Sequence, residues 1–255
     1  MFETIATYTP LLIPTFLLLD YVVQDRRYVK PRFWRTRALL VTAAIFVFTG
    51  ELAAWWGRLT GDYHVFDLSG LGTLAGAIVG ILVYEFIHYW YHRAVHSFDW
   101  LWRYFGHQMH HSAESLDAFG AYYLHPVDAA LFSTWGSLVF FPLLGLTTEA
   151  AILAALFLVF NAMFQHANIS TPHWLGYLIQ RPESHNIHHG RGVHRYNYAD
   201  LPLWDMIFGT FRNPRRLENA ACGFYTGASG RIPEMLVGRD VTTPADRLPS
   251  GARYA

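Results

Sequence analysis

The sequence is poor in cysteine, lysine and charged residues. Cys222 is the only cysteine, which excludes an internal disulfide framework, a CxxC zinc site and a protein-ligated iron–sulfur cluster. Lys30 is the only lysine and the formal net charge is +0, so we expect no broad basic surface and no nucleic-acid partner. A GxGxxG dinucleotide motif following a predicted strand is also missing.

Charged residues make up 15% of the 255 residues and hydrophobic residues 53%, which is too apolar for an ordinary soluble fold. We therefore predict an all-α integral membrane protein, a bundle of about four to five hydrophobic helices. The apolar runs lie at 5–23, 38–56, 70–84, 127–146 and 149–164. The first run lacks a basic start and a clear small-residue cleavage site, so we do not interpret it as a cleaved signal peptide.

The topology follows from the loop after the first apolar run. Six basic residues lie between Arg26 and Arg37, and the positive-inside rule places this loop in the cytoplasm. Counting membrane passes from there puts every histidine group on the cytoplasmic side, as a histidine-rich, metal-binding helical cap on the membrane bundle. Within the third run, Gly72, Gly76 and Gly80 are four residues apart, which indicates close packing of that helix against a neighbour.

Histidines gather in three polar stretches beside the apolar runs. These groups are His92 and His96; His107, His110 and His111; and His185, His188 and His189. Clustered imidazoles have no packing advantage over leucine, whereas neutral imidazole is a good metal ligand. The HxxHH spacing occurs twice, and adjacent histidines on a helix point about 100° apart, so each pair can reach two different ions. Two half-sites with two metals are therefore predicted.

Two further histidines are candidate ligands. His166 closes the last apolar run at the same predicted face, and His125, before Pro126, is a weaker candidate. Carboxylates and an amide near the motifs are candidates for orienting the imidazoles through hydrogen bonds. They are Asp99, Asp117, Asp128, Asn168, Glu183 and Asp205. His173 and His194 fit no motif and are interpreted as ordinary polar residues.

The motifs, taken together, resemble one known family. They are HRAVH at 92–96, HQMHHS at 107–112, HP at 125–126, FQHANI at 164–169, RPESHNIHHG at 181–190 and LWDMIFGTF at 203–211. From about residue 84 to 214 the chain resembles the fatty acid hydroxylase and sterol desaturase superfamily of membrane di-iron enzymes, in its bacterial form. The resemblance implies an oxidoreductase of the bacterial inner membrane that uses O2 and two iron ions to hydroxylate or desaturate a lipid.

Carried over position by position, the resemblance implies nine metal ligands: His92, His96, His107, His110, His111, His166, His185, His188 and His189. Many members of the superfamily have a further histidine four residues before the one at position 166, where this chain has Ala162. The tenth ligand is then His125, our first choice, or His88. The resemblance divides the chain into membrane helices at 1–83, a catalytic region at 84–214 and a cytoplasmic tail at 215–255.

Several alternatives stay open at this stage. Ferritin-like sites use paired ExxH motifs, and this chain has a single one at Glu85–His88. Zinc competes with iron for imidazole, so a zinc-dependent membrane hydrolase is an alternative, as is a metal transporter or sensor. Sterol, fatty acyl, ether-lipid and carotenoid substrates all fit a site at the membrane surface. Electrons must come from a separate ferredoxin-type or cytochrome-type partner, because the sequence shows no fused redox motif.

Overall fold

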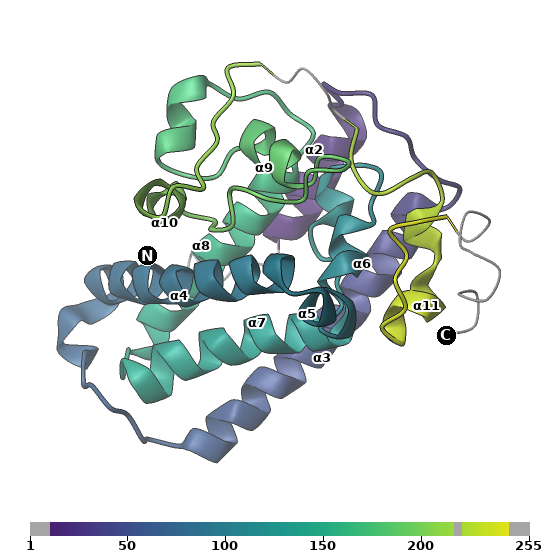
Figure 1. Cartoon of the computed structure of the whole chain (residues 1–255). Helices are drawn as coiled ribbons and strands as arrows, with labels where there is room; N and C mark the ends of the chain where they lie inside the picture. Colours follow the sequence, from purple (N-terminus) through teal and green to yellow (C-terminus); the bar gives the residue numbers. More distant parts are fainter. Residues whose placement is uncertain (1–10, 217–220, 245–255) are drawn as a thin grey trace.

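The computed structural model describes residues 11–216 and 221–244, and every named element within them is a helix (Figure 1). The prediction of an all-α protein is confirmed for this part of the chain. An isolated antiparallel bridge between Gly190 and Cys222 is the one β-type pairing there. Of the first predicted run, residues 5–10 lie outside the described residues, and the remainder forms helix α2, Leu12–Val22.

Three helical segments are long and apolar enough to cross a membrane. They are α3 (Trp34–Thr60), the segment Ser69–Ser97 that contains α4 (Gly72–Ser97), and α8 (Thr148–His166). The predicted run at 127–146 forms the shorter α7, Pro126–Leu138, followed by the π-helical turn η4, Val139–Leu143. Pro142 lies inside this turn and has no backbone N–H, so it cannot continue an α-helix. The chain is an integral membrane protein by these criteria.

The long helices pack as two contacting pairs, α4 with α8 and α3 with α7 (Figure 1). On α4 the predicted close packing occurs at Gly76 and Gly80 but not at Gly72, where a Cβ would meet no atom within 4 Å. A Cβ atom at Gly76 would lie 3.0 Å from Cβ of Ala150, and one at Gly80 would lie 2.8 Å from a methyl carbon of Leu146. Glycine at these positions lets α4 pack closely against α8 and against Leu146 in the turn before it. The pairing carries the histidines at the C-terminal ends of α4 and α8 to the same side of the molecule.

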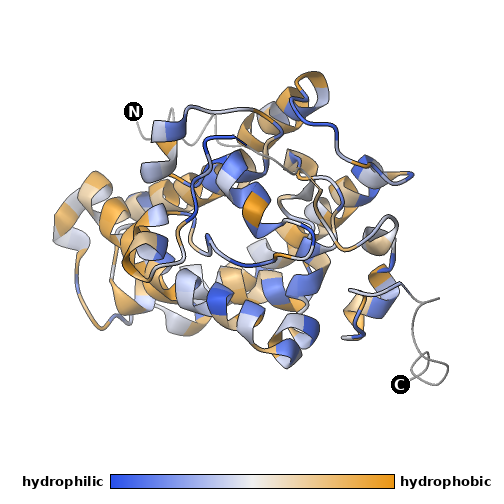
Figure 2. Ribbon diagram, turned by 45° about the horizontal axis from the view of Figure 1, so that its top comes forward, coloured by the Kyte–Doolittle hydropathy of each residue, from blue (hydrophilic) through white to orange (hydrophobic). Residues whose placement is uncertain are grey.

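Large apolar side chains are exposed along α3, as lipid contact requires. They include Leu39, Leu40, Val47, Phe48, Trp55 and Leu59. In Figure 2 the hydrophobic colour dominates the long helices, whereas the hydrophilic colour is concentrated in the connecting segments and short helices. An apolar exposed surface of this extent is stable in a bilayer and would be unstable in water.

Short helices form the polar part of the molecule. They are α5 (Asp99–Tyr104), α6 (His107–His111), η3 (Ala118–Gly120), η5 (His173–Tyr177), α9 (Pro182–His188), α10 (Pro202–Ile207), η6 (Ala228–Gly230) and α11 (Ile232–Leu236).

The segment 221–244 packs against α6 and forms hydrogen bonds with it. Met109 of α6 shares a buried cluster with Met235 and Val241. Gln108 donates from Nε2 to the carbonyl of Arg239 over 2.8 Å and accepts from the N–H of Val241 over 3.3 Å. The last described segment of the chain is thus part of the core around the second histidine motif.

Candidate metal centre

The fold brings nine histidines into two groups. Five side chains, His92, His96, His107, His111 and His188, place one ring nitrogen each within 4.8 Å of one another. Four others, His110, His166, His185 and His189, do the same. We call these the five-nitrogen group and the four-nitrogen group. Both draw on α6 and α9, while α4 serves the first and α8 the second.

The adjacent histidines explain how two short helices serve two groups. His110 and His111 follow each other in α6, and His188 and His189 do so at the end of α9. Because successive residues point about 100° apart on a helix, one member of each pair joins each group. The expectation that each pair reaches two different ions stays a prediction, and the two members of each pair lie in different groups.

Hydrogen bonds from Nδ1 orient the imidazoles of the five-nitrogen group. His92 donates to the carbonyl of Tyr198 over 2.6 Å, and His188 donates to the carbonyl of Tyr196 over 2.7 Å. His107 donates to the carboxylate of the buried Asp128 over 2.8 Å. Carbonyl and carboxylate oxygens only accept, so in each neutral ring Nδ1 carries the proton and Nε2 carries a lone pair.

These lone pairs face one another. Nε2 of His107 lies 2.9 Å from Nε2 of His92, although both rings have their proton on Nδ1. Nε2 of His188 is buried without a hydrogen-bond partner among the described residues. An unpaired buried polar atom costs about 1–3 kcal/mol, and facing lone pairs repel each other. A metal cation bound among these nitrogens removes both penalties, so the donor set fits a metal.

In the four-nitrogen group, His166 is oriented in the same way. His166 donates from Nδ1 to the carbonyl of Ala162 over 2.7 Å, one turn earlier in α8. Its Nε2 lies 3.2 Å from Nε2 of His110 and 3.1 Å from Nε2 of His185. His185 Nδ1 lies 3.3 Å from Nε2 of the buried Gln180. The free lone pair of His166 therefore points at two other imidazole nitrogens.

Burial keeps the imidazoles outside the membrane-spanning segments neutral. It lowers the pKa of five histidines well below the ordinary value, and neighbouring imidazoles lower each pKa further. These are His110, His111, His185, His188 and His189. Neutral imidazole is the form that binds metal, so at neutral pH these imidazoles are in the protonation state that can bind a metal ion.

The loop after α9 supplies the backbone acceptors. Tyr196 and Asn197 have φ of 69° and 51°, in the left-handed region that costs a non-glycine residue about 1–2 kcal/mol. Asn197 Nδ2 donates to the carbonyls of Ser184 and Arg212, which holds this conformation. Asp205 accepts from the N–H of Tyr198 over 2.9 Å. The strained loop thus presents the carbonyls that orient His92 and His188.

The two candidates for a tenth ligand lie outside both groups. His125 is the N-cap of α7, where its Nδ1 accepts from the N–H of Val127 over 3.1 Å. Its ring occupies the space beside Gly106, where a Cβ would overlap it at 2.1 Å. His88 stacks on His92, with ring centroids 5.4 Å apart, and belongs to a separate group with Glu85 and Asp200.

Of the six carboxylate and amide residues predicted to orient imidazoles, two do so in the structure and four do not. Asp128 contacts a grouped histidine directly, and Asp205 acts through the loop. The remaining four take part in other interactions: Asp99 with Arg103, Asp117 with Trp34, Asn168 with Arg26, and Glu183 with Arg26 and Arg181.

The sequence interpretation missed His194. Its Nδ1 lies 3.1 Å from Nδ1 of His111, so it is not an ordinary polar residue. It lies in no HxxHH spacing, and no local signal in the sequence would have found it.

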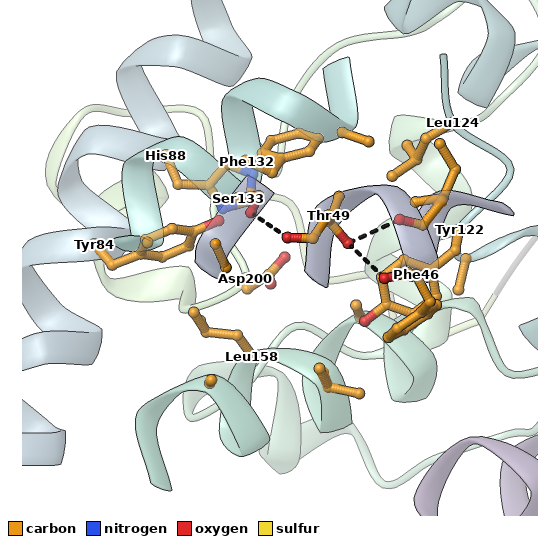
Figure 3. A pocket seen from close by; sticks show the side chains of 18 of the residues that line it. Phe46, Thr49, Tyr84, His88, Tyr122, Leu124, Phe132, Ser133, Leu158 and Asp200 are labelled. Carbon is orange, nitrogen blue, oxygen red and sulfur yellow. Dashed lines mark hydrogen bonds between the residues drawn. The ribbon is translucent and has the colours of Figure 1, made fainter. Parts of the chain in front are cut away.

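An apolar cavity of about 510 Å³ adjoins both groups. Its wall combines residues of α3, α7 and α8 with histidines of the five-nitrogen group, His92 and His107, and of the four-nitrogen group, His110, His166 and His185. Phe141 and Ile152, which also line it, are 38% and 37% exposed, so part of the wall belongs to the apolar outer surface of the helices. Figure 3 shows Thr49 and Ser133 on its wall, with hydroxyls already bonded to backbone carbonyls.

A small polar set interrupts this apolar wall. His88, Asp200 and Tyr84 lie close together in Figure 3, away from Phe46 and Tyr122. Burial and the nearby charge of Glu85 raise the pKa of Asp200 to about 7. Asp200 lines the cavity and lies close to His88.

Comparison with known proteins assigns the class. The family model for fatty acid hydroxylase matches residues 77–210, more than half of the 255-residue chain. The chain belongs to the fatty acid hydroxylase family, and the predicted resemblance is confirmed. The matched region contains all nine grouped histidines.

Three curated relatives show what the chain is similar to. Alkylglycerol monooxygenase from Homo sapiens is 33% identical over 161 residues, 59% of this chain and 33% of the relative. Sphinganine C4-monooxygenase 1 from Arabidopsis thaliana is 28% identical over 150 residues, 57% of each chain. Ornithine lipid hydroxylase OlsE from Rhizobium tropici is 27% identical over 150 residues, 57% of this chain and 44% of the relative.

The chain thus spans between about a third and somewhat over half of the length of these relatives. No solved structure matches it significantly.

Proposed function

We propose that the protein is a membrane-bound oxidoreductase that uses O2 and two iron ions to hydroxylate or desaturate a lipid. The observation that carries the proposal is the shared wall of the cavity. Histidines of both groups line the same apolar space, so a chain entering it from the bilayer reaches both. The names of the relatives, which are lipid hydroxylases and monooxygenases, support a lipid substrate.

The nine grouped histidines would hold the two ions, and His125 is proposed as a helix cap. Two iron ions so held would supply redox chemistry in which a C–H bond, O2, two electrons and two protons give C–OH and water. The residues of the chain position and shield this chemistry. Asp128 and the carbonyls of Tyr196 and Tyr198 fix the imidazole rings, and the apolar cavity wall excludes bulk water.

We further propose that the centre lies on the cytoplasmic side of a bacterial inner membrane and receives electrons from a separate redox protein. Arg26, in the basic loop, pairs with Glu183 of α9 at 3.1 Å, so this loop and the metal-binding helices share one end of the molecule. The positive-inside rule then supports a cytoplasmic centre. A separate donor is supported by the lone Cys222 and the missing dinucleotide motif.

Metal analysis tests the proposal. The protein, purified from membranes of iron-supplied cells, is expected to contain about two irons per chain, and an iron-57 sample is expected to give the Mössbauer spectrum of a coupled pair. One zinc per chain, with no iron retained after anaerobic loading, would overturn it and make oxygen-independent ester hydrolysis the next assay. Turnover by the purified chain with NAD(P)H alone would contradict the separate electron donor.

A further inference from the structure

The set formed by Glu85, His88 and Asp200 lies outside both metal groups. One ligand-type atom from each of the three side chains lies within 4.8 Å of the others. All three are buried in the protein, with exposures of 0%, 8% and 7%. Buried carboxylates are expensive, and a set of this kind at a cavity wall indicates a ligand with polar character.

Glu85 fixes the position of Asp200. Its Oε2 accepts from the N–H of Asp200 over 2.8 Å and from the N–H of Leu201 over 3.1 Å. The Oδ1 atom of Asp200 accepts from Gln165 Nε2 over 2.8 Å. With its backbone and one oxygen held, Asp200 presents its carboxylate at the cavity wall (Figure 3). Glu85 Oε1 lies 3.6 Å from Nδ1 of His88 and pairs with it. The second carboxylate oxygen of Asp200, Oδ2, accepts no hydrogen bond from the described residues and is the atom of the set left to bind a ligand.

The set also lies close to the metal groups, because the ring of His88 stacks on that of His92 with an interplanar angle of 10°. We propose that Asp200, positioned by Glu85, binds a hydroxyl group of the lipid substrate, so that the carbon oxidised lies near that hydroxyl. This inference rests on the proposed function and narrows its substrate class to lipids with a hydroxyl on the part that enters the cavity.

Charge selects a hydroxyl over other polar groups. A carboxylate or phosphate would have to be buried beside the two carboxyl groups of Glu85 and Asp200, and metal ions held by neutral imidazoles oppose entry of an ammonium group. A hydroxyl is neutral and donates one hydrogen bond, which a buried carboxylate accepts strongly. The hydroxyls of Thr49 and Ser133, on the same wall, already donate to backbone carbonyls.

The test is anaerobic binding of radiolabelled dodecan-1-ol and 1-methoxyundecane to the iron-loaded protein in detergent micelles, corrected for protein-free micelles. The two probes match in length and oxygen content, and only the alcohol donates a hydrogen bond. The wild-type chain is expected to bind the alcohol at least about tenfold more tightly. Equal affinities in the wild type would overturn the proposal without any variant.

Substitutions test whether Asp200 causes the preference for the alcohol. Asp200→Ala is expected to abolish the preference for the alcohol, and Asp200→Asn to restore part of it, because an amide also bonds to a hydroxyl. Thr49→Val, at another polar position on the same wall, is the control and should keep the preference. An unchanged preference in Asp200→Ala would contradict the assignment.

Metal analysis of the same preparations separates this inference from the proposed function. If the wild type holds more than two metal ions and Asp200→Ala loses one of them, the set binds a cation and the hydroxyl assignment is wrong. If the wild type prefers the alcohol but contains no iron pair, the proposed function fails while the hydroxyl site stands.

Discussion

His107 donates from Nδ1 to the carboxylate of Asp128 over 2.8 Å, while its Nε2 faces Nε2 of His92 at 2.9 Å. Asp128 is fully buried and also accepts from the hydroxyl of Tyr91 over 2.7 Å. One carboxylate on α7 therefore determines which nitrogen of an α6 histidine is free to bind metal.

Substitution of this carboxylate should weaken metal binding. We expect Asp128→Asn to lower metal affinity about 10- to 100-fold, because an amide fixes the His107 tautomer less firmly. Competition with a chelator, followed by metal analysis, measures the change. Asp99→Asn, at an exposed partner of Arg103, is the control. Equal retention in Asp128→Asn and the wild type would show that the contact does not serve the metal.

The two groups should lose metal separately. His110→Ala removes a nitrogen from the four-nitrogen group, and His188→Ala removes one from the five-nitrogen group. Each variant is expected to lose about one ion per chain while remaining in the membrane fraction. His64→Ala, in an exposed loop, should keep full metal. Full retention by both site variants would refute the ligand assignment.

A substitution of His125 distinguishes a helix-capping role from a metal-ligand role. As the N-cap of α7 it should contribute to stability, and His125→Ala is expected to lower the free energy of unfolding by about 0.5–2 kcal/mol with no change in metal content. His125→Asn, which retains an N-cap acceptor, should recover part of the loss. Thermal unfolding combined with metal analysis gives both quantities. Loss of one ion by His125→Ala would make it the tenth ligand instead.

Ala162 occupies the position at which the family pattern often has histidine. It lines the cavity one turn before His166, and residues four apart on a helix are neighbours. We expect Ala162→His to add a fifth nitrogen to the four-nitrogen group and to slow metal loss to a chelator. Ala162→Phe, of similar bulk without a donor, should show no such slowing. Identical rates for the two variants would exclude coordination by the new histidine.

Side-specific labelling tests the topology. In a Cys222→Ser background, Arg27→Cys in the basic loop should resist a membrane-impermeant maleimide in intact cells and react in inverted vesicles. A cysteine placed at Asp62, in the loop between α3 and α4, should react in intact cells. The opposite pattern would place the metal centre outside the cytoplasm.

Local periodicity accounts for much that the sequence predicted. Side chains four apart on a helix are neighbours, so the spacings of His92 with His96 and of His107 with His111 predict shared groups, and the fold brings those residues together. The glycines at 76 and 80 likewise marked a close helix contact that the structure contains. These signals lie within single helices, so they can be recognised in the sequence without knowing how the helices pack.

Contacts between distant segments were not predictable in this way. The acceptors for His92 and His188 are backbone carbonyls, which carry no residue signature, and His194 reaches His111 through a loop with left-handed backbone. The role of His125 did have a signal, because proline at the next position is typical of the first turn of a helix. That signal indicates an N-cap, and the HP motif drew attention to metal binding instead.

The contacts between α6 and the segment 221–244 bear on the order in which the protein folds and binds metal during synthesis. All nine grouped histidines precede residue 190, yet the contacts of Gln108 with Arg239 and Val241 form only after the last part of the segment has been translated. The second histidine motif thus acquires its final support after every ligand is already in place in the nascent chain. Iron loading should therefore be a late, post-insertion event, and ribosome-stalled chains ending before residue 221 should capture iron poorly.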